Sequence, residues 1–147
     1  MRYMMIVTGP ESFETSGPPP AALYEAVERL TEESVRNGTM VSFGGLHPTS
    51  TGARLRIKDG KVVRTDGPFT ESKEVIGGFS IMNAASKEEA LAQGEIFMEL
   101  HRVHWPQWEG ELEIRLMFEA EEDVQAAQLE GSRISAQPSV EVTSRTE

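Results

Sequence analysis

The stretch EVIGGFSIMNAASKEEALAQGEIFMEL, residues 74–100, decides the fold because it joins a strand directly to a capped helix. Its first part, residues 74–84, is rich in apolar residues and predicts a strand. Ser86 stands at the N-cap position of the following helix, and two glutamates occupy the first turn, where the helix dipole favours acidic side chains. The stretch therefore predicts a β–α unit whose helix stops before Pro106.

Two further features of this stretch bear on packing. The pair Gly77-Gly78 suggests a β-bulge or a close approach of another backbone, because glycine inside a strand often marks one of these. The helical part has a predicted apolar side, made of Ala90, Leu91, Ile96, Phe97 and Leu100.

Comparable signals outside the stretch complete the order β, α, β, β-hairpin, β, α, β. A first helix is expected to begin at Pro19 or Pro20 and to end at Asn37-Gly38, since proline is tolerated in a first turn and glycine is the usual C-cap. Its predicted apolar face consists of Leu23, Ala26, Val27, Leu30, Ser34 and Val35. The remaining strands are predicted over residues 2–8, 39–46, 53–60, 61–65 and 111–118.

The pair Asp59-Gly60 is a two-residue turn signal that predicts antiparallel pairing of the strands on either side. Leu55 and Ile57 alternate with basic residues, which is typical of a half-buried strand. Without this extra hairpin the order is βαββαβ, the ferredoxin-like arrangement of α+β proteins. Such a sheet carries helices on one face, so we expect its open face to pack against a second subunit in a homodimer.

The net charge of -10 is concentrated near the C-terminus. Residues 119–147 hold seven of the 24 acidic residues and two of the 14 basic ones. Nucleic-acid binding needs a basic surface, so this class of function is excluded. We expect one domain over residues 1–119 and an acidic extension over 120–147, with a short helix at 121–130 and an extended end that packs on the partner subunit.

Cysteine is absent, which excludes disulfides, thiolate metal sites and cysteine nucleophiles. No apolar run approaches the ~20 residues that span a bilayer, so no membrane association is expected. The short apolar run after Arg2 does not resemble a signal peptide. We therefore expect a cytoplasmic protein.

The segment TDGPFTESKE, residues 65–74, lies between two β-rich runs and is the first candidate for a functional loop. Asp66 can accept hydrogen bonds from backbone amides, and the glycine and proline that follow it fix a bend. One interpretation is a structural turn in which Phe69 fills the core and the charged residues lie at a solvated edge. The other is the wall of a site, and the residues alone allow both.

This segment, together with the opening MRYMMIV and the run GGLHPTSTGARLRIKDGKVVRTDGPFTESKEVIGGFSIMNAAS, resembles the YCII-related family, in particular its DGPF subgroup, named for Asp66–Phe69. The resemblance spans residues 1–119 and implies a ferredoxin-like unit that dimerises through its sheets, a dimeric α+β barrel. Some relatives carry a His–Asp pair proposed as an active site, one is a dehydrochlorinase of a chlorinated hydroxyquinone, and the fold is similar to that of muconolactone isomerase. Genes of the subgroup often lie beside those of extracytoplasmic-function sigma factors, which implies a regulatory role instead.

The resemblance implies that His47 in GLHP and Asp66 in DGPF form a catalytic pair. Histidine moves protons near neutral pH, and a nearby carboxylate can orient it. The alternative is that His47 only forms hydrogen bonds within its loop. Substrate-binding candidates are Ser50, Arg54, Phe69, Glu71 and Lys73, although a surface strand and loop ion pairs explain the charged ones equally well.

A metal site at His101 and His104 is not expected, because two histidines at one helical spacing lack further placed ligands and the helix dipole already favours histidine at a C-terminus. Trp105 and Trp108 are expected to seal the helix–strand junction or the dimer, with an aromatic pocket wall as the alternative. Nucleotide-binding glycine motifs and a nucleophilic serine elbow are missing from the sequence, and we expect no cofactor.

Taken together with what the resemblance implies, the sequence predicts a homodimeric α+β protein that binds a small organic molecule, acidic or ring-containing, and transfers a proton in an elimination or isomerisation. The alternative is a non-catalytic module that binds a small ligand or a protein partner, linked to an extracytoplasmic-function sigma factor.

Overall fold

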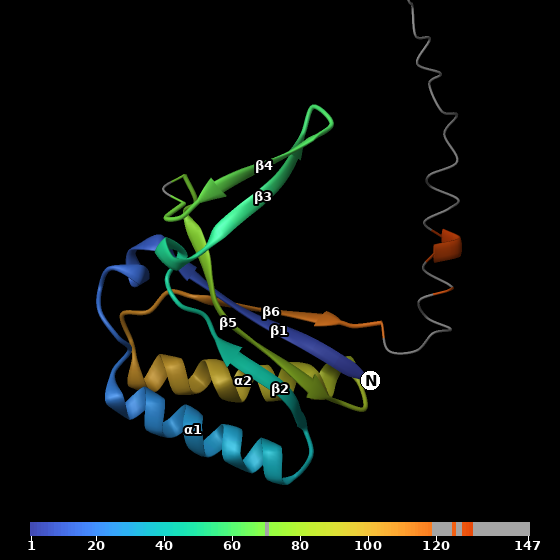
Figure 1. Cartoon of the computed structure of the whole chain (residues 1–147). Helices are drawn as coiled ribbons and strands as arrows, with labels where there is room; N and C mark the ends of the chain where they lie inside the picture. The colour runs from blue at the N-terminus through green and yellow to red at the C-terminus, as the bar shows by residue number, and fades with distance from the viewer. Residues whose placement is uncertain (70, 119–124, 126–127, 131–147) are drawn as a thin grey trace, which may run out of the picture. The chain divides into compact units, whose positions relative to one another are not determined.

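Within the residues that the computed structural model describes, 1–69, 71–118, 125 and 128–130, four strands form one antiparallel sheet. β1 lies inside the sheet and pairs with both β5 and β6, while β5 also pairs with β2. With the additional hairpin set aside, this strand order is that of a ferredoxin-like fold (Figure 1), so the predicted α+β fold class is confirmed. The order across the sheet is β2 (Met40–Gly45), β5 (Glu74–Asn83), β1 (Arg2–Pro10), β6 (Glu111–Leu116).

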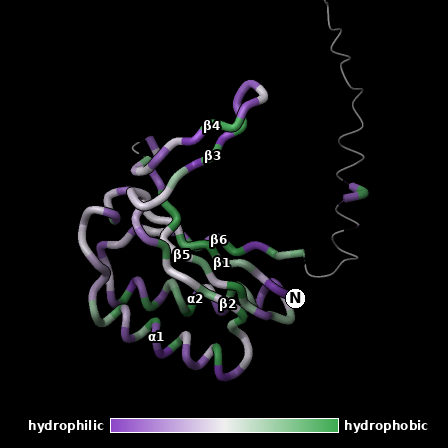
Figure 2. The backbone as a smooth tube through the Cα atoms, viewed as in Figure 1, coloured by the Kyte–Doolittle hydropathy of each residue, from purple (hydrophilic) through white to green (hydrophobic). Residues whose placement is uncertain are grey.

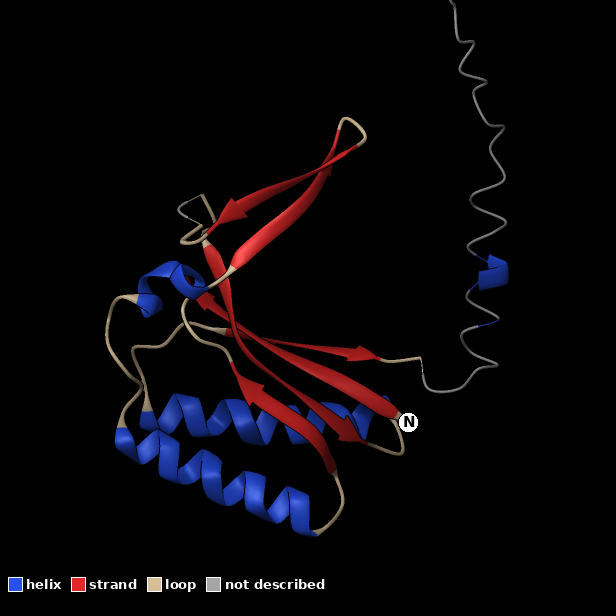
Figure 3. Cartoon of the chain, in the orientation of Figure 1, coloured by secondary structure: helices blue, strands red, loops and turns tan. Residues whose placement is uncertain are grey.

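Helices α1 (Ala21–Arg36) and α2 (Lys87–His104) cover the same face of the sheet (Figure 3). α2 begins where Ser86 Oγ accepts a hydrogen bond from the Glu89 N–H at 3.1 Å, which satisfies one of the free amides of the first turn. α1 ends at Asn37-Gly38, where Gly38 has a φ of 80°. The predicted start of α2 and the predicted end of α1 are therefore confirmed.

The glycine pair in β5 makes both a bulge and a close backbone contact. The register of β1 against β5 shifts between Val7 and Thr8 and leaves Gly77 outside the ladder. A Cβ atom on Gly78 would lie 2.9 Å from the Gly44 carbonyl oxygen, so the neighbouring strand β2 approaches closely here.

The core between the sheet and the helices is small. Its buried cluster consists of Tyr3, Ala84 and Ala90, and Ile114 packs against it. Hydrophobic residues run along the strands of the sheet (Figure 2), yet no large side chain of the described residues is completely buried. The two layers therefore leave unfilled space between them.

Three residues of the predicted helical faces lie at the surface instead: Val35, Leu91 and Ile96 are 54%, 41% and 53% exposed. The buried positions of α2 are Ala90, Gly94 and His101, and those of α1 are Leu23, Ala26 and Ser34. The buried stripes are thus narrow and centred mostly on small residues. Neighbours one or two positions along the chain are rotated toward solvent.

The hairpin of β3 (Ala53–Lys58) and β4 (Lys61–Asp66) forms a separate two-stranded sheet. Both of its turn residues have positive φ, 52° at Asp59 and 75° at Gly60, as a tight hairpin turn requires. The predicted hairpin is therefore confirmed.

The predicted half-burial of the hairpin is wrong. Leu55 and Ile57 are 72% and 80% exposed, and Val62, which pairs with Ile57, is 70% exposed. The hairpin projects from the four-stranded sheet and pairs only with itself (Figure 1), so neither layer of the domain covers its faces.

The helix predicted over 121–130 lies outside the described residues except at 125 and 128–130, which are helical. Most of the predicted acidic extension likewise lies outside them. The site described below belongs to the compact unit Met1–Met117. None of the helices in the described residues is long and apolar enough to cross a bilayer.

Candidate functional site

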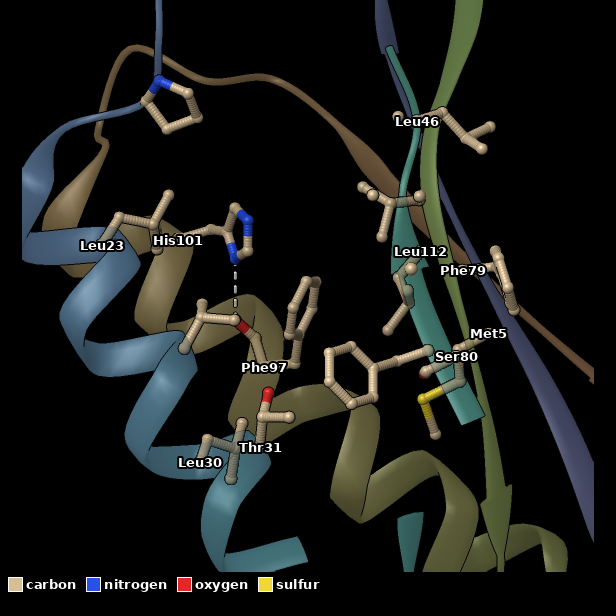
Figure 4. A pocket seen from close by; sticks show the side chains of 18 of the residues that line it. Met5, Leu23, Leu30, Thr31, Leu46, Phe79, Ser80, Phe97, His101 and Leu112 are labelled. Carbon is tan, nitrogen blue, oxygen red and sulfur yellow. Dashed lines mark hydrogen bonds between the residues drawn. The ribbon is translucent and has the colours of Figure 1, made fainter. Parts of the chain in front are cut away.

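A cavity of about 980 Å³ lies between the two helices and the sheet (Figure 4). Its volume is at the upper end of the roughly 300–1,000 Å³ range of small-molecule sites. The space that the small core leaves unfilled is thus a concave cavity of the size of a small-molecule site. Apolar side chains from both layers line it, among them Met5, Leu23, Leu30, Phe97 and Leu112.

The charged groups that line this cavity are acidic. They are Glu14, Glu33 and Glu89, and none of the described lining residues is a lysine or an arginine. An anionic ligand would therefore leave water without meeting a counter-charge, which is unfavourable in a low-dielectric site.

His101 of α2 is the most deeply buried ionisable side chain of the cavity wall, with 9% of its surface exposed. Its Nδ1 lies 3.0 Å from the Phe97 carbonyl oxygen. A carbonyl only accepts, so Nδ1 carries the proton and Nε2 of the neutral ring is an acceptor. Burial lowers the pKa of His101, and the bond to Phe97 opposes this effect only in part, so the neutral ring is favoured.

The second ring nitrogen of His101, Nε2, is directed into the cavity (Figure 4) and forms no hydrogen bond with any described residue. The ring is held from two sides, with its centroid 4.4 Å from that of Phe97 and 4.6 Å from that of Trp108. His101 is thus a fixed acceptor at the end of an apolar chamber.

Three aromatic side chains close this end of the cavity. Trp105 and Trp108 are stacked with ring centroids 6.2 Å apart, and Phe13 meets Trp105 edge-on at 5.0 Å. All three line the cavity, so the two tryptophans are the aromatic pocket wall that the sequence left as an alternative.

Gln93 carries a buried acceptor about two helical turns before His101, on the same face of α2. Its Nε2 donates to the Asn83 carbonyl oxygen at 3.3 Å, while its Oε1 is buried without a partner among the described residues. The opposite orientation of the amide would place two acceptors against each other, so the hydrogen bond fixes this one. Gln93 also lines the cavity.

Glu14 joins two loops at the edge of the cavity. Its Oε1 accepts a hydrogen bond from the Thr49 N–H and its Oε2 accepts one from Thr49 Oγ1, both at 2.7 Å. His47 lies two residues before Thr49; it lines the cavity and is exposed. The predicted proton carrier is therefore at the border between the cavity and solvent.

Asp66 lies at the end of β4 and does not line the cavity. Its carboxylate forms an exposed ion pair with Arg64, with Oδ1 3.2 Å from Nε. In the described part of the chain, no hydrogen bond joins Asp66 to His47. The two residues belong to neighbouring loops, because the Gly67 N–H donates to the Gly52 carbonyl oxygen at 2.9 Å.

A model of the YCII-related domain matches residues 1–95, well over half of the sequence. The chain belongs to the YCII-related family. It is also 39% identical over 66 residues to an uncharacterized protein of Rhizobium meliloti (strain 1021), which covers 45% of this chain and 51% of the relative. The chain thus spans about half the length of this relative. His101 lies beyond the matched residues 1–95, so the family match does not bear on its role.

The predicted substrate-binding residues of this YCII-related chain lie around the base of the hairpin and outside the lining of the large cavity. The Arg54 guanidinium stands 3.9 Å from the centroid of the Phe69 ring and donates to Ser72 Oγ at 3.0 Å. Phe69 is half-buried, and Ser50 and Glu71 are exposed.

Lys73, the last of these candidates, borders a separate small hollow of about 240 Å³. Glu74, Glu109 and Glu111 border the same hollow. The described residues contain no group of three or more histidine, aspartate or glutamate side chains placed to bind a metal ion.

Neither His101 nor Gln93 was predicted from the sequence to line a ligand site, although one signal was available. Gln93, Phe97 and His101 follow one another at intervals of four, the spacing of a single helical face. Two polar residues on an otherwise buried face are unusual and mark a site or a hydrogen-bonded core position.

Proposed function

We propose that this YCII-related protein binds a small organic molecule in the cavity between its helices and sheet and transfers a proton on it without a cofactor. The observation that carries the proposal is the cavity itself, an apolar chamber with a few polar groups on its walls. This combination is what small-molecule sites require for both affinity and orientation. The family to which the chain belongs is compatible with this role.

His47 is the proposed proton carrier. It borders the cavity and is exposed, so it can contact a bound molecule and exchange its proton with water. In an isomerisation, His47 would take a proton from one carbon and return a proton to another. In an elimination, the proton would pass to His47 while the leaving group departs with its bonding electron pair.

Asp66 is the proposed orienting partner of His47. What supports this assignment is the contact between their loops, since Gly67 packs against the segment that follows His47. The carboxylate would have to exchange its ion pair with Arg64 for a bond to the imidazole. Exposed pairs of this kind contribute only ~0–1 kcal/mol, so breaking the ion pair between Asp66 and Arg64 costs little free energy.

Binding is tested by a thermal-shift screen of neutral and acidic ring compounds against the full chain. A ligand at about 100 times its Kd stabilises the native state by ~2.7 kcal/mol, roughly 10 °C in Tm for a domain of this size. Thr31→Trp, which fills the cavity from α1, should abolish the shift, whereas Glu32→Trp on the exposed side of the same helix should preserve it. A shift that survives Thr31→Trp would place the ligand elsewhere.

Proton transfer is tested with any compound that binds, by following the exchange of its carbon-bound hydrogens for solvent deuterium by NMR. His47→Ala should slow the exchange by about 10²–10⁴-fold, the usual contribution of a general acid or base. Asp66→Asn should slow it less. Exchange that is unchanged by His47→Ala would remove His47 from the mechanism while leaving the binding proposal intact.

We also propose that two copies pack through the open face of the sheet. Met4 pairs with Ile81 and Ile6 pairs with Phe79 on the face away from the helices, and all four are half-buried in the single chain. This apolar strip is the support for the assignment. Phe79→Glu should give a monomer in analytical ultracentrifugation, and Ile57→Glu on the hairpin should not. The reverse result would move the interface to the hairpin.

A further inference from the structure

We infer that the outer edge of β3 is a docking site for an extended acidic segment of a partner protein, in which acidic and apolar residues alternate. The site lies on the projecting hairpin and outside the lining of the cavity, so this inference goes beyond the proposed function and does not depend on it. Three features carry it: an unpaired strand edge, an alternation of basic and apolar side chains along that edge, and basic side chains without counter-charges.

The first feature is the free backbone edge of β3. This strand pairs with β4 and with no other strand of the described residues (Figure 1). The Gly67 N–H donates to the Gly52 carbonyl oxygen, and bonded pairs recur at every second residue of an antiparallel ladder. The backbone groups of Leu55 and Ile57 therefore point away from β4. Such an edge accepts a further strand through main-chain hydrogen bonds.

The second feature is the regular alternation along β3. Leu55 and Ile57 lie on one face of the hairpin, because successive side chains of a strand point to opposite faces. The other face carries the basic side chains of the strand, which are Arg54, Arg56 and Lys58. All five are exposed. An added strand that alternates acidic and apolar residues would match both faces at once, since directly opposite side chains share a face.

The third feature is the lack of counter-charges on the basic face. Five of the 14 lysine and arginine residues fall within residues 53–66, together with two acidic residues. Lys58 stands directly opposite Lys61, an arrangement in which like charges repel. Within the described part of the chain, Arg56 and these two lysines form no ion pair, although Asp59 belongs to the same turn. An acidic strand would compensate these charges, so the edge is complementary to such a partner.

The same pattern argues against a second copy of the chain at this edge. Two β3 strands side by side would set basic side chains against basic or apolar ones in either register, so no charge would be compensated. A nucleic acid would use the basic face alone and would leave the free backbone edge and the apolar face without a role. The three features together favour a polypeptide.

The test is fluorescence anisotropy of the full chain with a labelled short peptide of alternating glutamate and valine. The matched control peptide has the same composition, with all glutamates placed before all valines. The alternating peptide should bind about tenfold more tightly than this block peptide, because only the alternating one meets both faces of β3. Arg56→Glu should weaken its binding about tenfold, whereas Arg29→Glu on the exposed side of α1 should leave it unchanged.

A third peptide tests the backbone pairing. Its valines are expected to lie opposite Leu55 and Ile57, whose backbone groups point outward, so N-methylation of the valines should abolish binding. This arm needs no variant of the protein and stays decisive if Arg56→Glu does not fold.

The inference would be overturned if the alternating peptide did not bind, or if it bound no better than the block or N-methylated peptide. Unchanged binding in Arg56→Glu would have the same meaning. Equal binding of an oligothymidylate would make the hairpin a general polyanion surface, and a change of oligomeric state in Arg56→Glu would assign it to a second copy; both results would overturn the inference. The cavity and the proposed function are judged separately, by the ligand screen with Thr31→Trp.

Discussion

Gly67 lies so close to the backbone of Thr49 that a Cβ atom on Gly67 would stand 1.7 Å from the Thr49 carbonyl oxygen. The same threonine is held from the other side by both carboxylate oxygens of Glu14. The turn that begins at Asp66 and the loop before α1 therefore clamp one short backbone segment. Since that segment starts directly after the loop of His47, the clamp fixes one edge of the cavity.

Gly67→Ala should destabilise the chain by about 2–3 kcal/mol, because the added methyl group overlaps the Thr49 carbonyl oxygen and forces the backbone to shift. Urea unfolding measures the change. Gly52→Ala is the matched control in the same loop, since its Cβ would keep an ordinary distance of 3.5 Å from the Thr49 oxygen. A loss as large for Gly52→Ala would show that the loop tolerates no side chain at all, contrary to the geometry.

Gly94→Ala should also cost stability, about 1–2 kcal/mol, although alanine is the better helix former by ~1 kcal/mol. A Cβ at position 94 would lie 2.6 Å from Ile114 Cδ1. Ile114→Val removes that atom, so the double variant should recover part of the loss. A double-mutant cycle in chemical denaturation measures the coupling, and strict additivity would mean that the helix shifts instead of meeting Ile114.

Ser86→Ala should reduce the free energy of unfolding by about 1 kcal/mol, because it removes the hydrogen bond from Ser86 Oγ to the Glu89 N–H at the start of α2. Thermal unfolding followed by circular dichroism is sufficient to detect this. Ser50→Ala, an exposed serine outside any helix cap of the domain, should stay within about 0.5 kcal/mol of wild type. Equal effects would remove the cap as the cause.

Stability should fall as pH drops below about 6.5, in part because of His101. Burial lowers the pKa of His101 in the folded chain below the unfolded value of about 6.5, so the unfolded state binds more protons between the two values. Stability therefore rises with pH through that window and is lost on acidification. The rings in contact with His101, Phe97 and Trp108, do not titrate in this range.

The measurement is the free energy of unfolding of wild type and His101→Phe between pH 7.5 and pH 5. The wild type should lose more stability than the variant over this interval, by no more than about 1.4 kcal/mol per pH unit for one proton. His104→Phe should retain the wild-type loss. Parallel curves for wild type and His101→Phe would show that His101 does not resist protonation.

Local signals were enough to predict the elements of the fold. Asp59-Gly60 specifies its turn because both residues take positive φ, and Ser86 specifies the start of α2 through a bond three residues along the chain. The bulge at Gly77 was also predictable from the sequence, because glycine inside a strand often marks a bulge or a close backbone contact. Each of these features depends on the residues next to it.

The errors and omissions concern contacts between distant segments. Alternation in β3 indicates one apolar side but not whether anything covers it, so the exposure of Leu55 and Ile57 depended on where the hairpin points. The place of His101 in the cavity wall depended on the distance between the helix layer and the sheet, which the small core leaves wide. The helix dipole already accounts for a histidine in the last turn of a helix. For this reason the sequence did not indicate that His101 lines a cavity.

The bond between the Gly67 N–H and the Gly52 carbonyl oxygen brings the two ends of the hairpin together at the edge of the domain. The segment between these glycines, β3 and β4 with their turn, begins and ends at this edge and does not join the four-stranded sheet. The length and composition of β3 and β4 are thus decoupled from the architecture that holds the cavity. Insertions and deletions between residues 53 and 66 would therefore change the surface that the hairpin exposes to other molecules and would leave the cavity unchanged.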